Sequence, residues 1–207
     1  MKITSIIIII ATYISANHFF SVGKYDGPIS DHFDGKHFHN LGYKGHTILS
    51  RSYRLKTFLT FAFKKLDRNI WKVRKLSNGQ TKPVPRVMGR EIVATFVNHS
   101  TVLIQTEGIN ILTDPIWAKR ASPLSFGEKR YVDPGVAIND LPEIDIILLS
   151  HDHYDHMDTK TLKKIVDRDK SKIYTPLGNS KFLVKKGIYS GIDMDTTVLL
   201  QLRPNHK

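Results

Sequence analysis

The sequence predicts a fold of the α/β class, because strand-like and helix-like segments alternate along its second half. The apolar run at 144–149 indicates a buried strand, and a shorter strand is expected at 172–175. Between them, apolar residues recur at helical spacing after Asp158, a residue type that often caps the start of a helix. A second helix is expected at 179–186, where Gly187 ends the pattern.

Three further strand-like segments come earlier, at 91–96, 101–106 and 109–112. The first two flank a turn at Asn98-His99, and the Pro-containing stretch 78–85 has the composition of a linker. At 207 residues, the chain has room for one domain and an N-terminal extension. We therefore expect three parts: a leader at 1–23, an extension at 24–85 and an α/β domain at 86–207.

A loop rich in metal-ligand residues follows the buried strand. It offers His151, His153, Asp155 and His156 within a few residues. Imidazole nitrogen and carboxylate oxygen are ligands that zinc and similar divalent metals accept. His151 and His153 are two apart, so an extended loop points both the same way. Asp155 and His156 follow where the chain turns, and two ions roughly 3.5–4 Å apart could share a bridging hydroxide. The sequence therefore predicts a two-metal site.

This loop resembles the signature of the metallo-β-lactamase-fold hydrolases. Four flanking segments are similar to the branch that contains N-acyl-phosphatidylethanolamine phospholipase D: 96–104, 111–116, 120–123 and 141–145. Ser30 to Gly35 resembles an N-terminal segment of bacterial members described as outer-membrane proteins. The resemblance extends over roughly residues 28 to 190.

The resemblance implies an αββα sandwich made of two ββα halves. In the family a third histidine, a bridging aspartate and a final histidine complete the metal site further along the chain. Few residues follow His156 here, and His206 is the only histidine among them. The expectation is a C-terminally truncated member, or one fragment of a split gene, with a partial αββα fold and one sheet face uncovered. The missing half, or a homo-oligomer, would then be a partner.

The resemblance also implies a metal-dependent phosphodiesterase of the phospholipase D type with Zn²⁺ as cofactor. His151 and His153 would hold one ion, and Asp155 and His156 the other. A metal-bound water, its pKa lowered toward roughly 7, would be the nucleophile, which makes Asp155 a catalytic residue. Two alternatives stay open: a lactonase-like hydrolase of a sugar phosphate, and a non-catalytic, membrane-associated remnant with a vestigial, weakly binding site.

Other polar residues carry alternative interpretations. Asp114 either hydrogen-bonds a ligand histidine, as the resemblance implies, or caps a turn. His99 either lines the site or is structural, and Tyr154 either lines a substrate cleft or packs under the loop. A cluster near the N-terminus forms either a separate metal site or an ordered loop; it comprises Asp31, His32, Asp34, His37 and His39.

The leader and the charge distribution suggest export or membrane association. Residues 3–23 contain no Asp, Glu, Lys or Arg, which is consistent with a cleaved signal, an uncleaved anchor or a buried strand. The net charge of +12 comes largely from 51–90, where Asp67 is the only acid. Apolar residues of 55–66 share one helical face, so this helix either docks on its own domain or lies on an anionic phospholipid membrane. No nucleic-acid motif is present. The chain has no cysteine, which excludes disulfides and thiolate ligands.

Overall fold

The computed structural model describes residues 23–39, 80–120, 130 and 132–195. The chain forms two compact units, one made of Met1–Tyr25 and Ser77–Lys207 and the other of Asp26–Leu76. The leader up to residue 22, the basic segment 51–75 and His206 lie outside the described residues. Within the described residues, no helix is both long enough and apolar enough to cross a bilayer.

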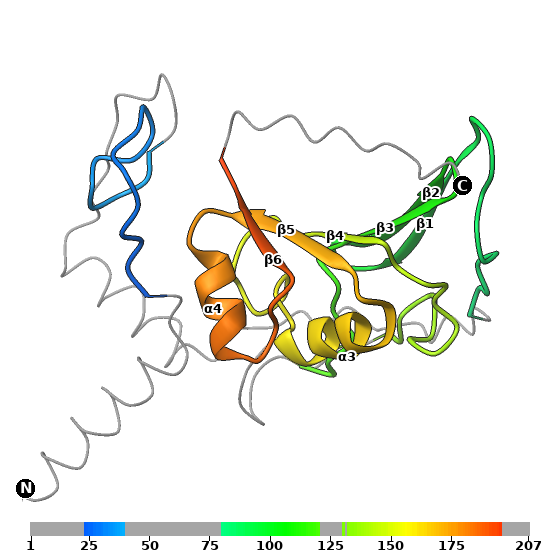
Figure 1. Cartoon of the computed structure of the whole chain (residues 1–207). Coiled ribbons are helices and arrows are strands. Elements are labelled where there is room, and N and C mark those ends of the chain that lie inside the picture. Colours follow the sequence, from blue (N-terminus) through cyan, green and yellow to red (C-terminus); the bar gives the residue numbers. More distant parts are fainter. Residues whose placement is uncertain (1–22, 40–79, 121–129, 131, 196–207) are drawn as a thin grey trace, which may run out of the picture. The chain divides into compact units, whose positions relative to one another are not determined.

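The larger unit is built on a six-stranded sheet with strand order β1-β2-β3-β4-β5-β6. The first three strands are antiparallel neighbours, and the last four run parallel to one another (Figure 1). The strands are β1 (Ile92–Asn98), β2 (Thr101–Thr106), β3 (Ile109–Thr113), β4 (Ile146–Leu148), β5 (Lys172–Pro176) and β6 (Gly191–Met194). Because β3, β4 and β5 are parallel, the loops that leave their carboxyl ends emerge along one edge of the sheet.

Two described helices follow the strands, as the sequence predicted. Helix α3 spans Thr159–Asp169, and Asp158 caps it by accepting a hydrogen bond from the backbone N–H of Thr161. Helix α4 spans Asn179–Lys185 and is followed by Gly187, whose φ of 73° lies in the left-handed region that glycine adopts without strain. The predicted strand at 144–149 is shorter in the structure, and the sequence did not predict β6.

The core lies between the sheet and the helices. Leu103, Leu112, Ile147 and Ile173 are paired in register across β2 to β5, and all four are fully buried. Both helices lie on this side of the sheet (Figure 1), and residues such as Leu162 belong to the same apolar cluster. The alternation of buried and partly exposed residues along β2 and β3 follows from this one-sided covering.

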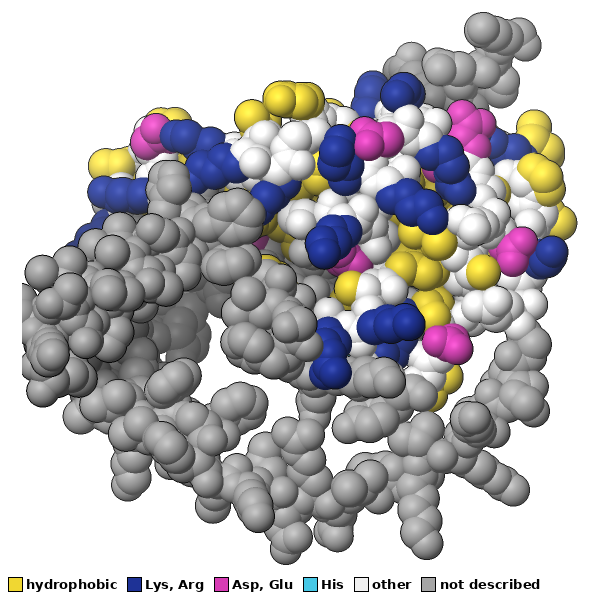
Figure 2. All heavy atoms as spheres, turned by 90° about the horizontal axis from the view of Figure 1, so that it is seen from below, with side chains coloured by type: hydrophobic (Ala, Val, Ile, Leu, Met, Phe, Trp, Pro, Cys, Tyr) yellow, Lys and Arg dark blue, Asp and Glu magenta, His cyan; other side chains and the backbone are white. Residues whose placement is uncertain are grey.

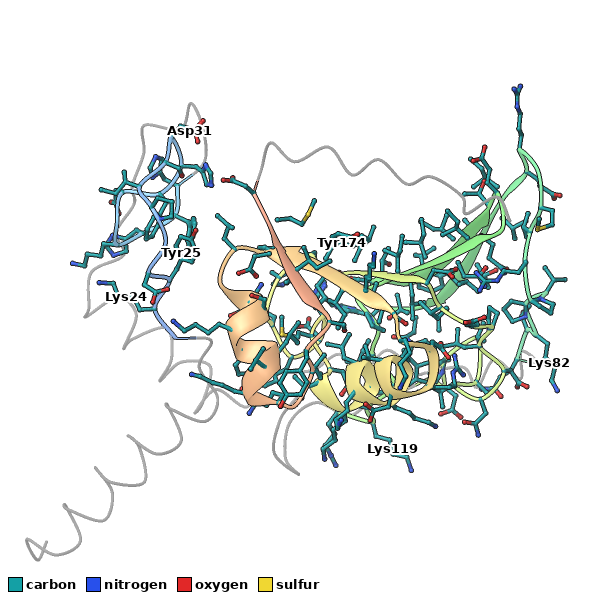
Figure 3. The ribbon with its side chains drawn as sticks, viewed as in Figure 1. Lys24, Tyr25, Asp31, Lys82, Lys119 and Tyr174 are labelled. Carbon is teal, nitrogen blue, oxygen red and sulfur yellow. The ribbon has the colours of Figure 1, made fainter. Side chains whose placement is uncertain are left out.

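The opposite face of the sheet is apolar and partly open to solvent. Ile92 and Phe96 on β1 are 69% and 67% exposed, and Ile192 on β6 is 38% exposed. Ile104 on β2 lies on this face and is half-buried. Tyr174 on β5 lies on the same face, on the side away from the helices (Figure 3). The sheet therefore has one face covered by the helices and an opposite face that is apolar and partly open to solvent.

The described part of the smaller unit, 26–39, is an ordered loop closed by backbone bridges. Phe33 pairs with Ser30 and Phe38, and the rings of Phe33 and Phe38 lie 4.5 Å apart. The Asp34 carboxylate accepts hydrogen bonds from the backbone N–H groups of Lys36 and His37 at 2.8 and 2.6 Å. These contacts agree with the ordered-loop interpretation of this segment.

Candidate metal centre

The predicted metal loop, from His151 to His156, begins shortly after β4 ends at Leu148, and it lies beside the end of β3. Thr113 on β3 pairs with Leu148 on β4, and the backbone N–H of Asp114 donates to the Leu148 carbonyl at 2.9 Å. Asp114 therefore leaves β3 next to the point where Ser150 leaves β4. Parallel pairing of the two strands brings these two distant segments together.

The buried carboxylate of Asp114 organises the start of the loop. Its Oδ1 accepts the backbone N–H of Ser150 at 2.8 Å, and its Oδ2 accepts the Ser150 hydroxyl at 2.7 Å. The same Oδ2 lies 2.8 Å from Nδ1 of His156. Asp114 is only 5% exposed, so these partners take the place of water around a buried charge. Two interpretations of Asp114 were open, a hydrogen bond to a ligand histidine or the cap of a turn. The structure shows the first contact, because Asp114 hydrogen-bonds His156, a predicted ligand.

The contact with Asp114 determines which ring nitrogen of His156 is available to bind a metal ion. An ionised carboxylate can only accept, so Nδ1 of His156 carries the proton that this hydrogen bond uses. The other nitrogen, Nε2, is then an acceptor, and it lies 3.7 Å from Oδ2 of Asp155. An orienting carboxylate of this kind is the usual partner of a metal-binding histidine. His156 is thus held in a tautomer and orientation suited to an ion at Nε2.

The loop closes on itself before α3 begins. The carbonyl of His153 accepts the backbone N–H groups of His156 and Met157 at 2.9 and 2.7 Å. Met157 is buried in the core, and Asp158 follows as the N-cap of α3. The polar loop is therefore fixed at one end by Asp114 and at the other by the packed start of a helix.

The imidazole rings of the loop gather around His151. Its ring centroid lies 4.5 Å from that of His153 and 4.0 Å from that of His156. Its Nδ1 also lies 2.9 Å from the hydroxyl of Ser150. The structure thus brings together all three histidines that the sequence singled out. Their roles as ligands stay predictions.

The structure adds His99 to this group from a different element. His99 lies in the turn between β1 and β2, and its Nε2 is 3.2 Å from Oδ2 of Asp155. Its ring is 5.1 Å from that of His156. Ligand atoms of His99, Asp155 and His156 all lie within 4.8 Å of one another, close enough to hold an ion. Among the described residues, His32, His37 and His39 form no such group.

The electrostatics keep Asp155 ionised. Partial burial raises the pKa of its carboxyl group, but a hydrogen bond from its own backbone and the neighbouring His156 and His99 imidazoles, including a hydrogen bond from His99, lower it more. The resulting pKa lies below the ordinary value. An ionised carboxylate beside two imidazoles can bind a divalent cation. Tyr154 is 36% exposed; partial burial and the Asp152 carboxylate raise the pKa of its hydroxyl.

Three residues support the site in ways that the sequence did not reveal. Ser150 bridges Asp114 and His151, as described above. Asp158 was predicted only as a helix cap, yet its Oδ2 also accepts the backbone N–H groups of Trp117 and Ala118 at 3.3 and 2.9 Å. Arg130 donates to the Ala118 carbonyl at 2.6 Å. Asp158 and Arg130 therefore fix the segment that follows Asp114.

The donor set fits a divalent metal. The chain offers imidazole and carboxylate groups, one imidazole is oriented by a buried carboxylate, and a neighbouring carboxylate is held ionised. Such nitrogen and oxygen ligands suit zinc, and two histidines with one carboxylate also suit iron(II).

Comparison with known proteins defines the class of this fold and site. Residues 109–205 match the family described as the Beta-lactamase superfamily domain. The sequence-based resemblance to metallo-β-lactamase-fold proteins is thereby confirmed, and this fold implies a divalent metal site.

Two curated proteins named for N-acyl-phosphatidylethanolamine hydrolysis are similar to part of this chain. N-acyl-phosphatidylethanolamine-hydrolyzing phospholipase D 1 of Caenorhabditis elegans is 44% identical over 109 residues, which is 52% of this chain and 30% of that protein. The mitochondrial N-acyl-phosphatidylethanolamine-hydrolyzing phospholipase D of Saccharomyces cerevisiae is 27% identical over 113 residues, which is 55% of this chain and 24% of that protein. The chain thus spans about 30% or less of the length of these relatives.

Solved structures with similar regions include a metallo hydrolase from Ignicoccus hospitalis, with 21% identity and a TM-score of 0.40 over 54% of this chain and 42% of that chain. A diiron β-hydroxylase from Streptomyces venezuelae has 26% identity and a TM-score of 0.40 over 55% of this chain and 22% of that chain.

Proposed function

We propose that this chain carries the metal loop of a zinc-dependent phosphodiesterase that cleaves N-acyl phospholipids in the manner of a phospholipase D. The observation that carries the proposal is the convergence of Asp155 and His156 beside the buried Asp114, in a chain that is 44% identical over 109 residues to an enzyme named for this activity. The proposal concerns the substrate class as well as the metal, because a metallo-β-lactamase fold by itself supports many reactions.

The residues of the chain would divide the work as follows. When bound, a divalent ion lowers the pKa of a coordinated water toward about 7 and neutralises charge on phosphate oxygens. His151, His153, Asp155 and His156 are the groups that would hold it. Asp114 keeps His156 in one tautomer, so that Nε2 stays available as an acceptor. The ionised Asp155 adds negative charge, which favours a cation.

The charge of the helix-bearing face supports an anionic lipid as substrate or partner. Figure 2 shows this face from below, with Lys and Arg side chains spread across it and a smaller number of acidic side chains among them. Lys119 also points away from the sheet on this side (Figure 3). The exposed cations of α3 and α4 are Lys160, Lys163, Lys164, Arg168, Lys181 and Lys185. A basic surface gains about 1 kcal/mol per Lys or Arg near anionic lipid headgroups.

A membrane location follows from the same proposal. The exposed cations of α3 and α4, here called the basic helix face, and the basic segment 51–75 would both attract the chain to an anionic bilayer. The uncharged stretch 3–23 would anchor or export it. The interaction of exposed charges with lipid is screened by salt. Membrane binding through the basic surfaces is therefore expected to weaken as ionic strength rises.

A second candidate function is metal binding without turnover. The observation that favours it is the openness of the site: the side chains of His99 and Asp155 are 52% and 41% exposed. Electrostatic stabilisation of a transition state is strongest where water is excluded, and both of these side chains are partly exposed to water. Under this alternative the loop binds an ion weakly and the chain acts as a membrane-associated protein.

The deciding experiment combines metal analysis with a lipid hydrolysis assay. The purified chain is expected to bind zinc and to hydrolyse N-acyl-phosphatidylethanolamine slowly. Asp155→Asn should abolish the hydrolysis. Metal binding without hydrolysis would support the second candidate, and the absence of metal binding would refute both candidates.

A further inference from the structure

Three potential ligands from two separate elements converge at the open side of the loop. His99 comes from the β1–β2 turn, whereas Asp155 and His156 come from the loop after β4. Oδ2 of Asp155 lies 3.2 Å from Nε2 of His99 and 3.7 Å from Nε2 of His156. The ligand atoms of all three residues lie within 4.8 Å of one another.

These separations match the spacing of ligands around one ion. Zinc binds nitrogen and oxygen at about 2.0–2.2 Å in tetrahedral sites, so two of its ligands lie about 3.3–3.6 Å apart. The two observed distances fall on either side of this range. The shorter distance is within hydrogen-bonding range and the longer one is beyond it. A cation placed among the three residues would have ligand atoms at both separations.

His156 is held by a contact on its far side, and the turn that carries His99 is fixed by contacts of its chain neighbours. Nδ1 of His156 is engaged by the Asp114 carboxylate, which leaves Nε2 directed at Asp155. The turn that carries His99 is fixed on both sides of the residue. The Asn98 side chain donates to the Ile116 carbonyl at 3.0 Å, and the Ser100 carbonyl accepts the Thr113 hydroxyl at 2.7 Å.

The backbone of His99 itself has a φ of 41°, in the left-handed region that few non-glycine residues occupy. Such conformations persist only where the surroundings hold them, and they concentrate at functional sites. The turn therefore presents the His99 imidazole to Asp155 in a defined direction. The side chain is 52% exposed, so an ion can reach it from solvent.

We infer that His99, Asp155 and His156 together bind one divalent cation of the zinc type, with His99 as its third protein ligand. The donor atoms are Nε2 of His99, Oδ2 of Asp155 and Nε2 of His156, and the fourth position faces solvent. His151 and His153 lie outside this ligand set and remain predicted ligands of the other ion. The inference rests on the proposed function only in sharing Asp155 and His156 with it.

The test uses cobalt(II) and zinc titrations of the full chain after removal of metal by a chelator. The visible absorption of bound cobalt(II) reports the coordination geometry of the ion, so the readout does not depend on enzymatic activity. His99→Ala should weaken binding at one site at least tenfold and change the cobalt spectrum of that site. His99→Cys should restore binding, because a thiolate is also a ligand.

The decisive comparison is between His99→Cys and His99→Gln. Both substitutions place a non-glycine side chain on the same strained backbone, so they share any cost to folding. Glutamine can still donate a hydrogen bond to Asp155 but is a poor zinc ligand. If His99→Gln binds metal as tightly as the unmodified chain, His99 is only a hydrogen-bond donor and the inference is wrong.

Failure of the inference is distinguishable from failure of the proposed function. His156→Ala and His151→Ala serve as loop controls in the same titrations. If they lose metal whereas His99→Ala does not, the metal loop stands without His99. If neither these controls nor His99→Ala changes binding, the loop is not a metal site and both proposals fall.

Discussion

Asp114 and His156 are 42 residues apart in the chain, yet Oδ2 of Asp114 lies 2.8 Å from Nδ1 of His156. The contact exists because β3 and β4 are parallel neighbours whose carboxyl ends lie side by side. It joins a buried carboxylate to a side chain of the metal loop. The geometry of the candidate centre therefore depends on a residue that need not touch the ion.

The first prediction is that Asp114→Asn weakens zinc binding by about 10–100-fold, the usual effect of losing a residue that orients a ligand. The amide lacks the charge that favours the Nδ1–H tautomer of His156 and reorganises the hydrogen bonds to Ser150. Calorimetric titration with zinc measures the change. Asp133→Asn, at an exposed position, is the matched control and should leave the affinity unchanged.

The second prediction is that Asp158→Ala destabilises the larger unit by about 1–3 kcal/mol, because it removes a helix cap and the acceptor of the partly buried backbone N–H of Ala118. Asp158 is 8% exposed and accepts hydrogen bonds from Ala118 and Thr161. Urea denaturation measures the free energy of unfolding. Asp167→Ala removes an exposed carboxylate from the same helix, paired with Lys163 at 3.0 Å, and should cost less than about 1 kcal/mol. Equal losses in both variants would contradict the prediction.

The third prediction separates the two faces of the sheet. Leu103→Ala should destabilise the unit by about 2–5 kcal/mol, because it leaves a cavity at a fully buried position. Phe96→Ser, at a side chain that is 67% exposed, should change the free energy of unfolding little and should reduce self-association. Denaturation and light scattering measure the two effects. A large loss of stability in Phe96→Ser would show that the β1 face is covered in solution.

The fourth prediction concerns the basic helix face. Lys163→Glu combined with Lys164→Glu should lower binding to vesicles that contain anionic phospholipid, because each reversal replaces an attraction with a repulsion. Sedimentation with vesicles at two salt concentrations measures binding and its screening. Lys172→Glu combined with Arg90→Glu makes the same change in net charge outside the helix face, because both positions are exposed and Lys172 alternates along β5 with Ile173, which is buried on the helix side. If both pairs weaken binding equally, net charge alone is responsible and the helix face has no special role.

Several elements of the larger unit could be predicted from local sequence pattern. The apolar run at 144–149 indicated the strand that became β4, and Asp158 with the apolar spacing after it indicated α3. These features depend on residues that are close in sequence, and their physical cause is local. Strand β6 was missed because Gly191–Met194 is short and contains glycine and aspartate, so its pairing with β5 rather than its own pattern makes it a strand.

The sequence by itself determined which residues of the metal loop stand together, because His151 to His156 are neighbours in the chain. It also indicated a resemblance to metallo-β-lactamase-fold proteins, which agrees with the family match over residues 109–205. Only the tertiary structure decided that His99, 56 residues before Asp155, lies 3.2 Å from it, and that Asp114 orients His156. The reason is that strand pairing brings these residues together. A local pattern predicts a strand, but the neighbour that a strand acquires is determined by the packing of the whole sheet.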